Sequence, residues 1–286
     1  MAELPPIIRA LEDIAPRYQA ILCDVWGVVH NGERSFPAAS SALALAREQG
    51  IAVVLITNAP RPSADVIAQL KLLGVPDAAY DAIVTSGDVT RDLIAEGPRR
   101  VYHLGPERDR TIYDGLEVEL VEEFDASGVV CTGLFEDEVE TPEDYAATLR
   151  RLRARDLPFI CANPDIVVER GERLIWCAGA LARDYALLGG RTLISGKPHR
   201  PIYEAALKMA GKALGREVGV NDTLAIGDGM LTDVKGADDN GIDVLYVSGG
   251  IHAKEYGGVE KPDPKLLAAF LEAHGRQPVA IIPTLR

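Results

Sequence analysis

Residues 21–29 read Ile-Leu-Cys-Asp-Val-Trp-Gly-Val-Val, and this stretch constrains the fold more than any other part of the chain. Three apolar residues run into Asp24, and the chain then turns at Gly27. An apolar run this short predicts a buried strand of a parallel sheet. Open parallel sheets bind ligands at the carboxyl ends of their strands, so Asp24 is placed like a nucleophile or a metal ligand. An aspartate at a strand end can equally cap the next turn, and the stretch alone leaves both interpretations open.

The alternation of short apolar runs with helical segments continues in both outer parts of the chain. Apolar periodicity predicts a first helix over residues 4–14, ended by Pro16. Further strands are expected at 51–56, 82–86, 223–226, 244–247 and 279–282, and further helices at 38–49, 63–73, 201–214, 266–271 and near Val234. Strands and helices in alternation, with nearly continuous apolar strands, predict an α/β fold with a doubly wound, Rossmann-like parallel sheet.

The middle of the chain has a different pattern. Between about Gly87 and Gly190 we expect at least five short strands and three helices. The strands centre near Val101, Val118, Val129, Phe159 and Leu174, and the helices near Thr111, Tyr145 and Ala182. This block is long enough to be a domain of its own. The sequence therefore predicts a core of residues 1–86 and 191–286, interrupted by an inserted α/β domain of residues 87–190.

Composition excludes several classes of partner. The net charge of -13 argues against nucleic acid and against anionic membranes, because both need a basic surface. A phosphate ester is not excluded, since a bound cation can invert the field inside one pocket. The four cysteines lie in or beside apolar runs and are expected to be reduced core thiols, and the acidic run 136–140 is expected to be a solvated loop. Without a basic signal-peptide start or a long apolar segment, we expect a cytoplasmic protein.

Polar residues follow four of the expected strands: Asp24, then Thr57 with Asn58, then Lys197, then Asp228 with Asp233. Strand ends of a parallel sheet meet at one edge, so these groups can converge. Together they suit phosphoryl transfer: Asp24 as the nucleophile, and Asp24 with Asp228 sharing a Mg²⁺. Lys197 would neutralise negative charge and the Thr57 hydroxyl would donate to a phosphate oxygen. Taken singly, each residue has an ordinary structural explanation, and only the shared order favours a site.

That order resembles the haloacid dehalogenase superfamily, which consists mostly of Mg²⁺-dependent phosphatases. The stretches 24–28, 56–58, 196–198 and 227–233 look like its four motifs, and the resemblance covers nearly the whole chain. The long insertion is similar to the large α/β cap of subfamily IIA, which includes NagD-like and nitrophenylphosphatase-like proteins. Within the insertion, residues 162–165 and 179–181 resemble signatures of that subfamily, as do residues 282–284 at the carboxyl end.

The resemblance implies roles for individual residues. Asp24, Thr57 and Lys197 would be catalytic, and Thr57 and Lys197 would also bind substrate together with Asn58. The metal ligands would be Asp24, Asp228, Asp233 and the backbone carbonyl of Trp26. Asn163 and Asp165 would reach the substrate when the cap closes, although an Asn-Pro turn between cap elements explains them equally well.

Trp26 is the one serious departure from the family pattern. Family phosphatases carry a second aspartate two residues after the nucleophile, which protonates the leaving group and then activates water. The indole of Trp26 can donate a hydrogen bond but cannot exchange a proton near neutral pH. General acid–base catalysis is typically worth about 10²–10⁴-fold, so its loss predicts slow turnover without loss of phosphate binding.

Three functions are therefore compatible with the sequence. The first is a phosphatase acting on a small phosphorylated metabolite, either slow or with His30, Asp165 or a substrate group as a replacement acid/base. The second is a non-catalytic protein that binds a metal and a phosphate and senses a metabolite. The third, a dehalogenase-type hydrolase, fits less well, because dehalogenases carry a helical cap and need no metal. The sequence does not fix the oligomeric state, and a homodimer is one possible assembly, because caps of this type often dimerise.

Overall fold

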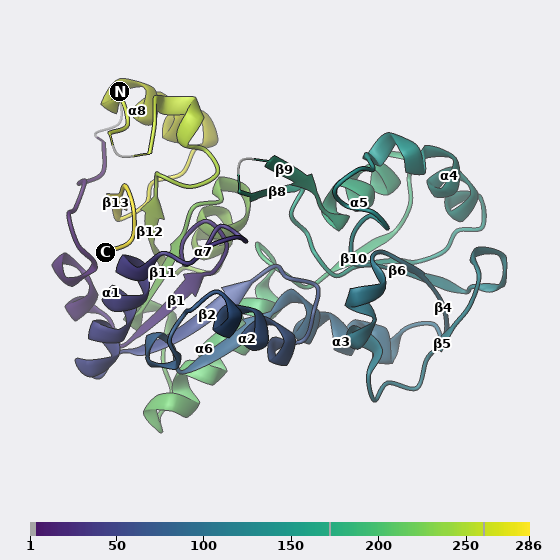
Figure 1. The fold of residues 1–286 in the computed structure, drawn as a ribbon, viewed down its shortest axis with the longest axis horizontal. Coiled ribbons are helices and arrows are strands. Elements are labelled where there is room, and N and C mark those ends of the chain that lie inside the picture. Colours follow the sequence, from purple (N-terminus) through teal and green to yellow (C-terminus); the bar gives the residue numbers. More distant parts are fainter. Residues whose placement is uncertain (1–3, 172, 260) are drawn as a thin grey trace. The chain divides into compact units, whose positions relative to one another are not determined.

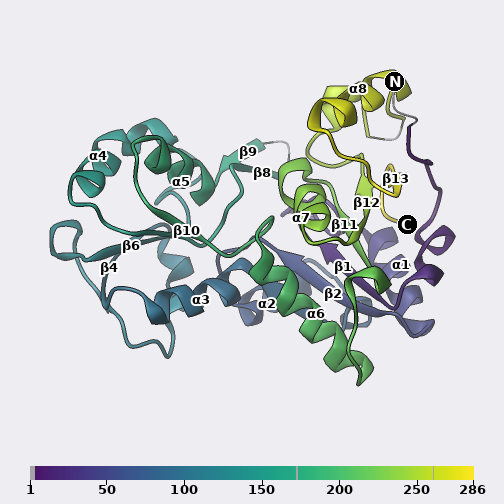
Figure 2. The same cartoon turned by 180° about the vertical axis from the view of Figure 1, so that it is seen from behind.

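The computed structural model describes residues 4–171, 173–259 and 261–286. These residues form two compact units, and each is interrupted in sequence by the other (Figures 1 and 2). Unit 1 comprises Met1–Thr57, Ile67–Val84 and Tyr203–Arg286. Unit 2 comprises Asn58–Val66 and Thr85–Ile202. No helix among the described residues is long and apolar enough to cross a membrane.

Unit 1 is built on a six-stranded sheet with the strand order β13-β12-β11-β1-β2-β3. The pairs β13–β12, β12–β11, β11–β1 and β1–β2 are all parallel. The strands are β1 (Ala20–Asp24), β2 (Ala52–Thr57), β3 (Ala82–Thr85), β11 (Thr223–Gly227), β12 (Asp243–Val247) and β13 (Ala280–Ile282). Every residue of β1, β2 and β11 is buried, as the continuous apolar runs predict for a parallel sheet covered on both faces. The predicted doubly wound α/β fold is confirmed.

Helices connect these strands at the expected places. They are α1 (Pro37–Glu48), α2 (Ser63–Leu72), α6 (Arg200–Leu214), α7 (Lys235–Asp239) and α8 (Pro264–His274). The ends of α8 follow directly from the sequence. The carboxylate of Asp263 accepts hydrogen bonds from the amides of Lys265 and Leu266, Pro264 occupies the first turn, and Gly275 ends the helix with a φ of 62°.

The predicted first helix over residues 4–14 is wrong. Ile7 instead pairs in parallel with Ile281. The amide of Ile8 donates to the carbonyl of Ile281, and the amide of Ile281 donates to the carbonyl of Pro6. Two short 3₁₀ turns follow, η1 (Leu11–Asp13) and η2 (Ala15–Arg17). The apolar spacing does mark buried residues, since Leu11 and Ile14 are both buried. The helix does not form because Pro5 and Pro6 favour an extended chain and Ile281 offers a strand partner.

Unit 2 has its own parallel sheet, with the strand order β10-β7-β6-β4-β5. Its strands are β4 (Arg100–Leu104), β5 (Glu119–Leu120), β6 (Gly128–Cys131), β7 (Phe159–Cys161) and β10 (Thr192–Ile194). An antiparallel hairpin of β8 (Val167–Arg170) and β9 (Arg173–Trp176) is separate from it. The helices are α3 (Ser86–Glu96), α4 (Ala146–Ala154) and α5 (Ala178–Leu187). Among the described residues, no strand of this unit joins the six-stranded sheet.

A second hydrophobic core holds unit 2 together. Leu149 and Leu152 of α4 pack with Phe159 of β7 and Tyr185 of α5, and all four are almost fully buried. The rings of Phe159 and Tyr185 stack with centroids 5.0 Å apart, and the Tyr185 hydroxyl donates to the carbonyl of Leu157 at 2.6 Å. The predicted core thiols belong to these interiors. All four cysteines are buried thiols that form no disulfide, and burial raises the pKa of the Cys161 thiol to about 12.

The boundaries of unit 2 differ from the expected insertion of residues 87–190. Strand β10 pairs with β7, so the second sheet extends to Ile194, and α3, which the sequence did not reveal, begins at Ser86. Asn58–Val66 also belongs to unit 2. The amide of Gly87 donates to the carbonyl of Ala59, and the Thr85 hydroxyl donates to the carbonyl of Arg61. That residues 87–190 act as a closing cap stays a prediction.

The remaining helical turns are short. They are η3 (Asp77–Ala79), η4 (Glu107–Tyr113), η5 (Glu123–Asp125), η6 (Pro142–Tyr145), η7 (Val220–Asp222), η8 (Met230–Val234) and η9 (Ala253–Tyr256). Of these, η8 is a π-helix, and it follows directly after β11. Single π turns occur often at functional sites.

Candidate active site

The carboxyl ends of β1, β2 and β11 bring the predicted residues of unit 1 to one edge of the sheet. In the β1–β2 pair, Asp24 lies opposite Ile56, one residue before Thr57. In the β1–β11 pair, Cys23 lies opposite Ile226, so Asp228 follows one residue beyond the end of β11. Because these strands are parallel, all their carboxyl ends lie on the same edge. The strand register therefore brings residues more than 200 positions apart in the sequence into one place.

Three carboxylates meet at this edge. Asp24, Asp228 and Asp233 each place an oxygen within 4.8 Å of the others, and their exposed fractions are only 6%, 6% and 3%. Buried like charges at this spacing repel strongly unless a cation or hydrogen-bond donors compensate them. Carboxylate oxygens are the ligands that Mg²⁺ prefers. This donor set fits a divalent cation.

Two glycines leave the space that Asp228 occupies. A Cβ on Gly27 would lie 2.2 Å from Asp228 Oδ2, and a Cβ on Gly250 would lie 2.0 Å from the same oxygen. Gly27 also has a φ of 80°, which disfavours any other residue. The amide of Ile251 donates to Asp228 Oδ2 at 2.8 Å and fixes the carboxylate in this space. Only glycine, which has no Cβ, allows the two loops to approach Asp228 so closely.

Asp233 is held by the π-helix η8. Its Oδ2 accepts a hydrogen bond from the amide of Gly229 at 2.9 Å, and a Cβ on Gly227 would lie 2.2 Å from its Cγ. The amides of Asp233 and Val234 both donate to the Gly229 carbonyl, at 2.9 and 3.1 Å, and Asp233 lies back beside Asp228, five residues earlier. Gly227 and Gly229 of the Gly-Asp-Gly sequence thus leave the space that Asp233 occupies.

Trp26 lies in the turn that follows β1. Hydrogen bonds from Gly27 to the His30 carbonyl and from Val29 to the Val25 carbonyl, both 2.8 Å, close this turn. The next residue, Gly27, lies against Asp228. That the Trp26 carbonyl ligates a metal stays a prediction. The indole is half-buried and meets the His30 ring edge-on, with centroids 4.9 Å apart.

His30 is one of the groups that the sequence suggests as a replacement for the missing general acid/base. It is 1% exposed, and its Nδ1 accepts a hydrogen bond from the amide of Gly32 at 2.9 Å. The ring therefore stabilises the turn after β1 and supports Trp26. Proton transfer by His30 stays a prediction.

The predicted residues of unit 2 form a second group around Asn58. Its amide nitrogen donates to Asp165 Oδ1 at 2.8 Å and to the Lys197 carbonyl at 3.2 Å, while its Oδ1 accepts from the Lys197 amide at 2.7 Å. Both amide hydrogens are thereby used. Asn58 and Lys197 are each 2% exposed. The observed role of Asn58 is to hold the Lys197 backbone in place, and direct contact with substrate stays a prediction.

Asn163 forms the turn that the sequence allowed as its alternative role. Its Oδ1 accepts a hydrogen bond from the amide of Asp165 at 3.0 Å, as in an Asx turn, and only 8% of the residue is exposed. Asp165 is half-buried and receives the hydrogen bond from Asn58. For both residues, contact with substrate stays a prediction.

Sequence reasoning missed an ionic network in unit 2. Asp109 is 3% exposed and lies 3.8 Å from the Nε of Arg61, and burial raises the pKa of its carboxyl. Asp137 pairs with Arg108 and, at 3.2 Å, with Arg170. The acidic run 136–140 is therefore not simply solvated, since the Asp137 side chain is only 12% exposed. These partners are about 30 or more residues apart, so no local pattern could have revealed them.

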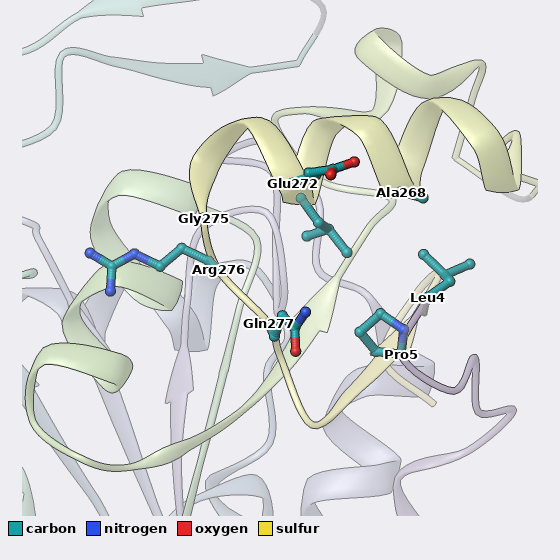
Figure 3. A pocket seen from close by; sticks show the side chains of 8 residues that line it. Leu4, Pro5, Ala268, Glu272, Gly275, Arg276 and Gln277 are labelled. Carbon is teal, nitrogen blue, oxygen red and sulfur yellow. The ribbon is translucent and has the colours of Figure 1, made fainter. Parts of the chain in front are cut away.

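A hollow of about 230 Å³ lies elsewhere in unit 1, between the amino-terminal segment and α8 (Figure 3). Leu4 and Pro5 line one side, and the carboxyl end of α8 with Arg276 and Gln277 lines the other. None of the predicted site residues lines it. The hollow is thus separate from the carboxylate cluster.

Comparison with known proteins identifies the family. A profile described as haloacid dehalogenase-like hydrolase matches residues 21–119, and a second, HAD-hydrolase-like profile matches residues 194–273. A crystal structure of a haloacid dehalogenase-like family hydrolase from Brucella suis 1330 is 61% identical, covers 98% of this chain and 100% of that one, and superposes with a TM-score of 0.89. The chain belongs to the haloacid dehalogenase-like hydrolase family.

Curated relatives refine that assignment. The 5'-nucleotidase YutF of Bacillus subtilis is 26% identical over 86% of this chain and 93% of its own length. The ribonucleotide monophosphatase NagD of Escherichia coli K-12 is 25% identical over 81% of this chain and 88% of its own. The resemblance to NagD-like members of the haloacid dehalogenase superfamily and the prediction of a hydrolase are thus confirmed.

The hydrogen bonds of Asn58 give a testable consequence. In Asn58→Asp, a carboxylate oxygen would face Asp165 Oδ1 and the Lys197 carbonyl with no hydrogen between them. We expect the free energy of unfolding to fall by at least about 1–3 kcal/mol, the cost of an unsatisfied buried polar group, as measured by denaturant unfolding. Exposed Asn221 offers the control Asn221→Asp, which should change stability little.

The double variant Asn58→Asp with Asp165→Asn exchanges donor and acceptor and should recover part of the loss. If Asn58→Asp alone is as stable as the wild type, the hydrogen-bond assignment is wrong.

Proposed function

We propose that the protein is a Mg²⁺-dependent phosphatase that hydrolyses a small phosphomonoester through an aspartyl-phosphate on Asp24. The buried carboxylate cluster at the end of β1 carries this proposal, because it combines a candidate nucleophile with a donor set for a hard cation. Membership of the hydrolase family supports it, as do relatives named as a 5'-nucleotidase and a ribonucleotide monophosphatase.

The proposed reaction has two displacements at phosphorus. In the first, a carboxylate oxygen of Asp24 bonds to phosphorus as the ester P–O bond breaks, and the leaving oxygen takes up a proton from solvent or from a group other than Trp26. In the second, a water oxygen bonds to phosphorus, the Asp24–phosphorus bond breaks, and inorganic phosphate leaves. Asp24 returns unchanged, so one water is consumed for each ester.

The surrounding residues have distinct proposed roles. Asp24, Asp228, Asp233 and the Trp26 carbonyl would hold Mg²⁺, which when bound would neutralise charge on the carboxylates and the phosphate. The Thr57 hydroxyl, at the end of β2, would donate to a phosphate oxygen. Lys197, by its position after an apolar run, is expected to neutralise charge on the transferring group.

Trp26 favours a second candidate, a non-catalytic protein that binds a metal and a phosphorylated metabolite. The indole stands where a phosphatase of this family has its acid/base, and nothing in its packing against His30 gives it an exchangeable proton near neutral pH. A dehalogenase is disfavoured, because such an enzyme has no need of the retained Asp228 and Asp233. The homodimer and the cytoplasmic location stay predictions.

Magnesium should stabilise the folded protein, because only the native state assembles the three carboxylates. At a concentration of 100 times the dissociation constant, the gain is about 2.7 kcal/mol, visible as a rise in melting temperature. Asp228→Asn should remove most of that rise. Asp125→Asn, an equal charge change at an exposed position, should leave it intact. A wild-type melting curve indifferent to millimolar Mg²⁺ would contradict the metal assignment.

Trp26 should make turnover depend on the leaving group. The aryloxide of an aryl phosphate can leave without being protonated, whereas the alkoxide of an alkyl phosphate needs a proton. The wild type should therefore hydrolyse the aryl ester much faster. Trp26→Asp should raise the alkyl rate by up to about 10²-fold, the lower end of general acid–base catalysis. The measurement is steady-state hydrolysis of a matched aryl and alkyl pair.

Trp26→Asn is the matched control, because it removes the same bulk but supplies no proton. An equal rise of the alkyl rate in both variants would mean that removal of the indole bulk causes the effect. Fast, equal hydrolysis of both esters by the wild type would show that another group donates the proton. Mg²⁺ binding without turnover of either ester would favour the binding protein.

A further inference from the structure

The loop that carries Asp228 and Asp233 is attached to a second loop, residues 249–256, by two neighbouring contacts. The amide of Ile251 donates to Asp228 Oδ2 at 2.8 Å. The next residue, His252, accepts a hydrogen bond at its Nε2 from the amide of Met230 at 3.4 Å. One contact thus fixes a carboxylate, and the other fixes the backbone at the start of η8.

The amide of Met230 needs an external acceptor. It belongs to the first residue of η8, and the first amides of a helix have no partner within the helix. Gly229, one residue earlier, donates to the side chain of Asp233. His252 therefore serves the amide between the two carboxylates.

The ring of His252 is oriented for this task. Its Nδ1 lies 2.9 Å from Glu255 Oε1, and because an ionised carboxylate only accepts, Nδ1 carries the hydrogen and Nε2 keeps its lone pair. The ring also packs on Phe270 of α8, with centroids 5.1 Å apart. Phe270 in turn packs edge-on against Tyr256, with centroids 5.3 Å apart. An aromatic cluster and a carboxylate together fix the direction of Nε2.

We propose that His252 is a positioning residue for the metal site: it holds the amide of Met230 and thereby keeps Asp228 and Asp233 at ligand spacing. This inference rests on the proposed function, since it assigns a purpose to the spacing of the carboxylates. The competing explanation is that His252 merely caps η9, because it precedes that turn and contacts Glu255 three residues later. A cap would stabilise η9 without affecting the loop of residues 228–233.

Two variants at position 252 separate these explanations. His252→Leu removes the acceptor, whereas His252→Gln can place an oxygen near the position of Nε2. His274→Leu controls for the aromatic packing alone, because the His274 ring lies 4.4 Å from Phe270 and 6.5 Å from His252, between centroids, but its Nδ1 bonds to the Phe270 carbonyl of its own helix. Two readouts are needed: amide hydrogen exchange of residues 229–234 without metal, and the apparent Mg²⁺ dissociation constant from melting-temperature titrations.

His252→Leu should speed exchange at Met230 and weaken Mg²⁺ binding about three- to tenfold, the range expected for the loss of one hydrogen bond. His252→Gln should restore both to within about twofold of wild type, and His274→Leu should leave both unchanged. Unchanged exchange in His252→Leu, or a failure of His252→Gln to restore it, would overturn the positioning role. Faster exchange in His252→Leu, with no Mg²⁺ response in the wild type itself, would instead overturn the proposed function and leave the loop contact established.

Discussion

Three buried negative charges within a few ångströms of each other are the constraint on which the rest of the candidate site depends. Asp24, Asp228 and Asp233 would repel one another in a dry interior, so each must be compensated. Backbone amides of Ile251 and Gly229 compensate part of the charge on Asp228 and Asp233. The proposed cation would compensate the remainder. Under the proposed function, binding of the cation would relieve this repulsion.

The glycines around the cluster follow from the same constraint. Gly27 and Gly250 both approach Asp228 so closely that a Cβ at either position would overlap its carboxylate. Gly227 leaves space for Asp233 in the same way. In unit 2, one side chain fixes a candidate site residue, since Asn58 hydrogen-bonds both the amide and the carbonyl of Lys197. In each unit, hydrogen bonds from within that unit thus hold candidate site residues in place.

The sequence predicted those features that depend on local pattern. Asp24, Thr57 and Asp228 could be found because each directly follows a buried apolar run, and a parallel sheet brings such ends together. The helix expected over residues 4–14 failed because Ile7 has a strand partner, Ile281, at the other end of the chain. The same limit hid the contact of His252 with Met230 and the ion pair of Asp137 with Arg170. Such contacts are set by the tertiary fold, and single-sequence periodicity carries no information about them.

The most direct test of this account is to trap the covalent intermediate. The wild-type protein would be mixed with Mg²⁺ and an aryl phosphomonoester, quenched in acid within the first turnover, digested, and analysed by peptide mass mapping. We expect one phosphoryl group on the peptide that contains Asp24, and none in Asp24→Asn. Hydrolysis that proceeds without labelling this peptide, or a label that persists in Asp24→Asn, would contradict it.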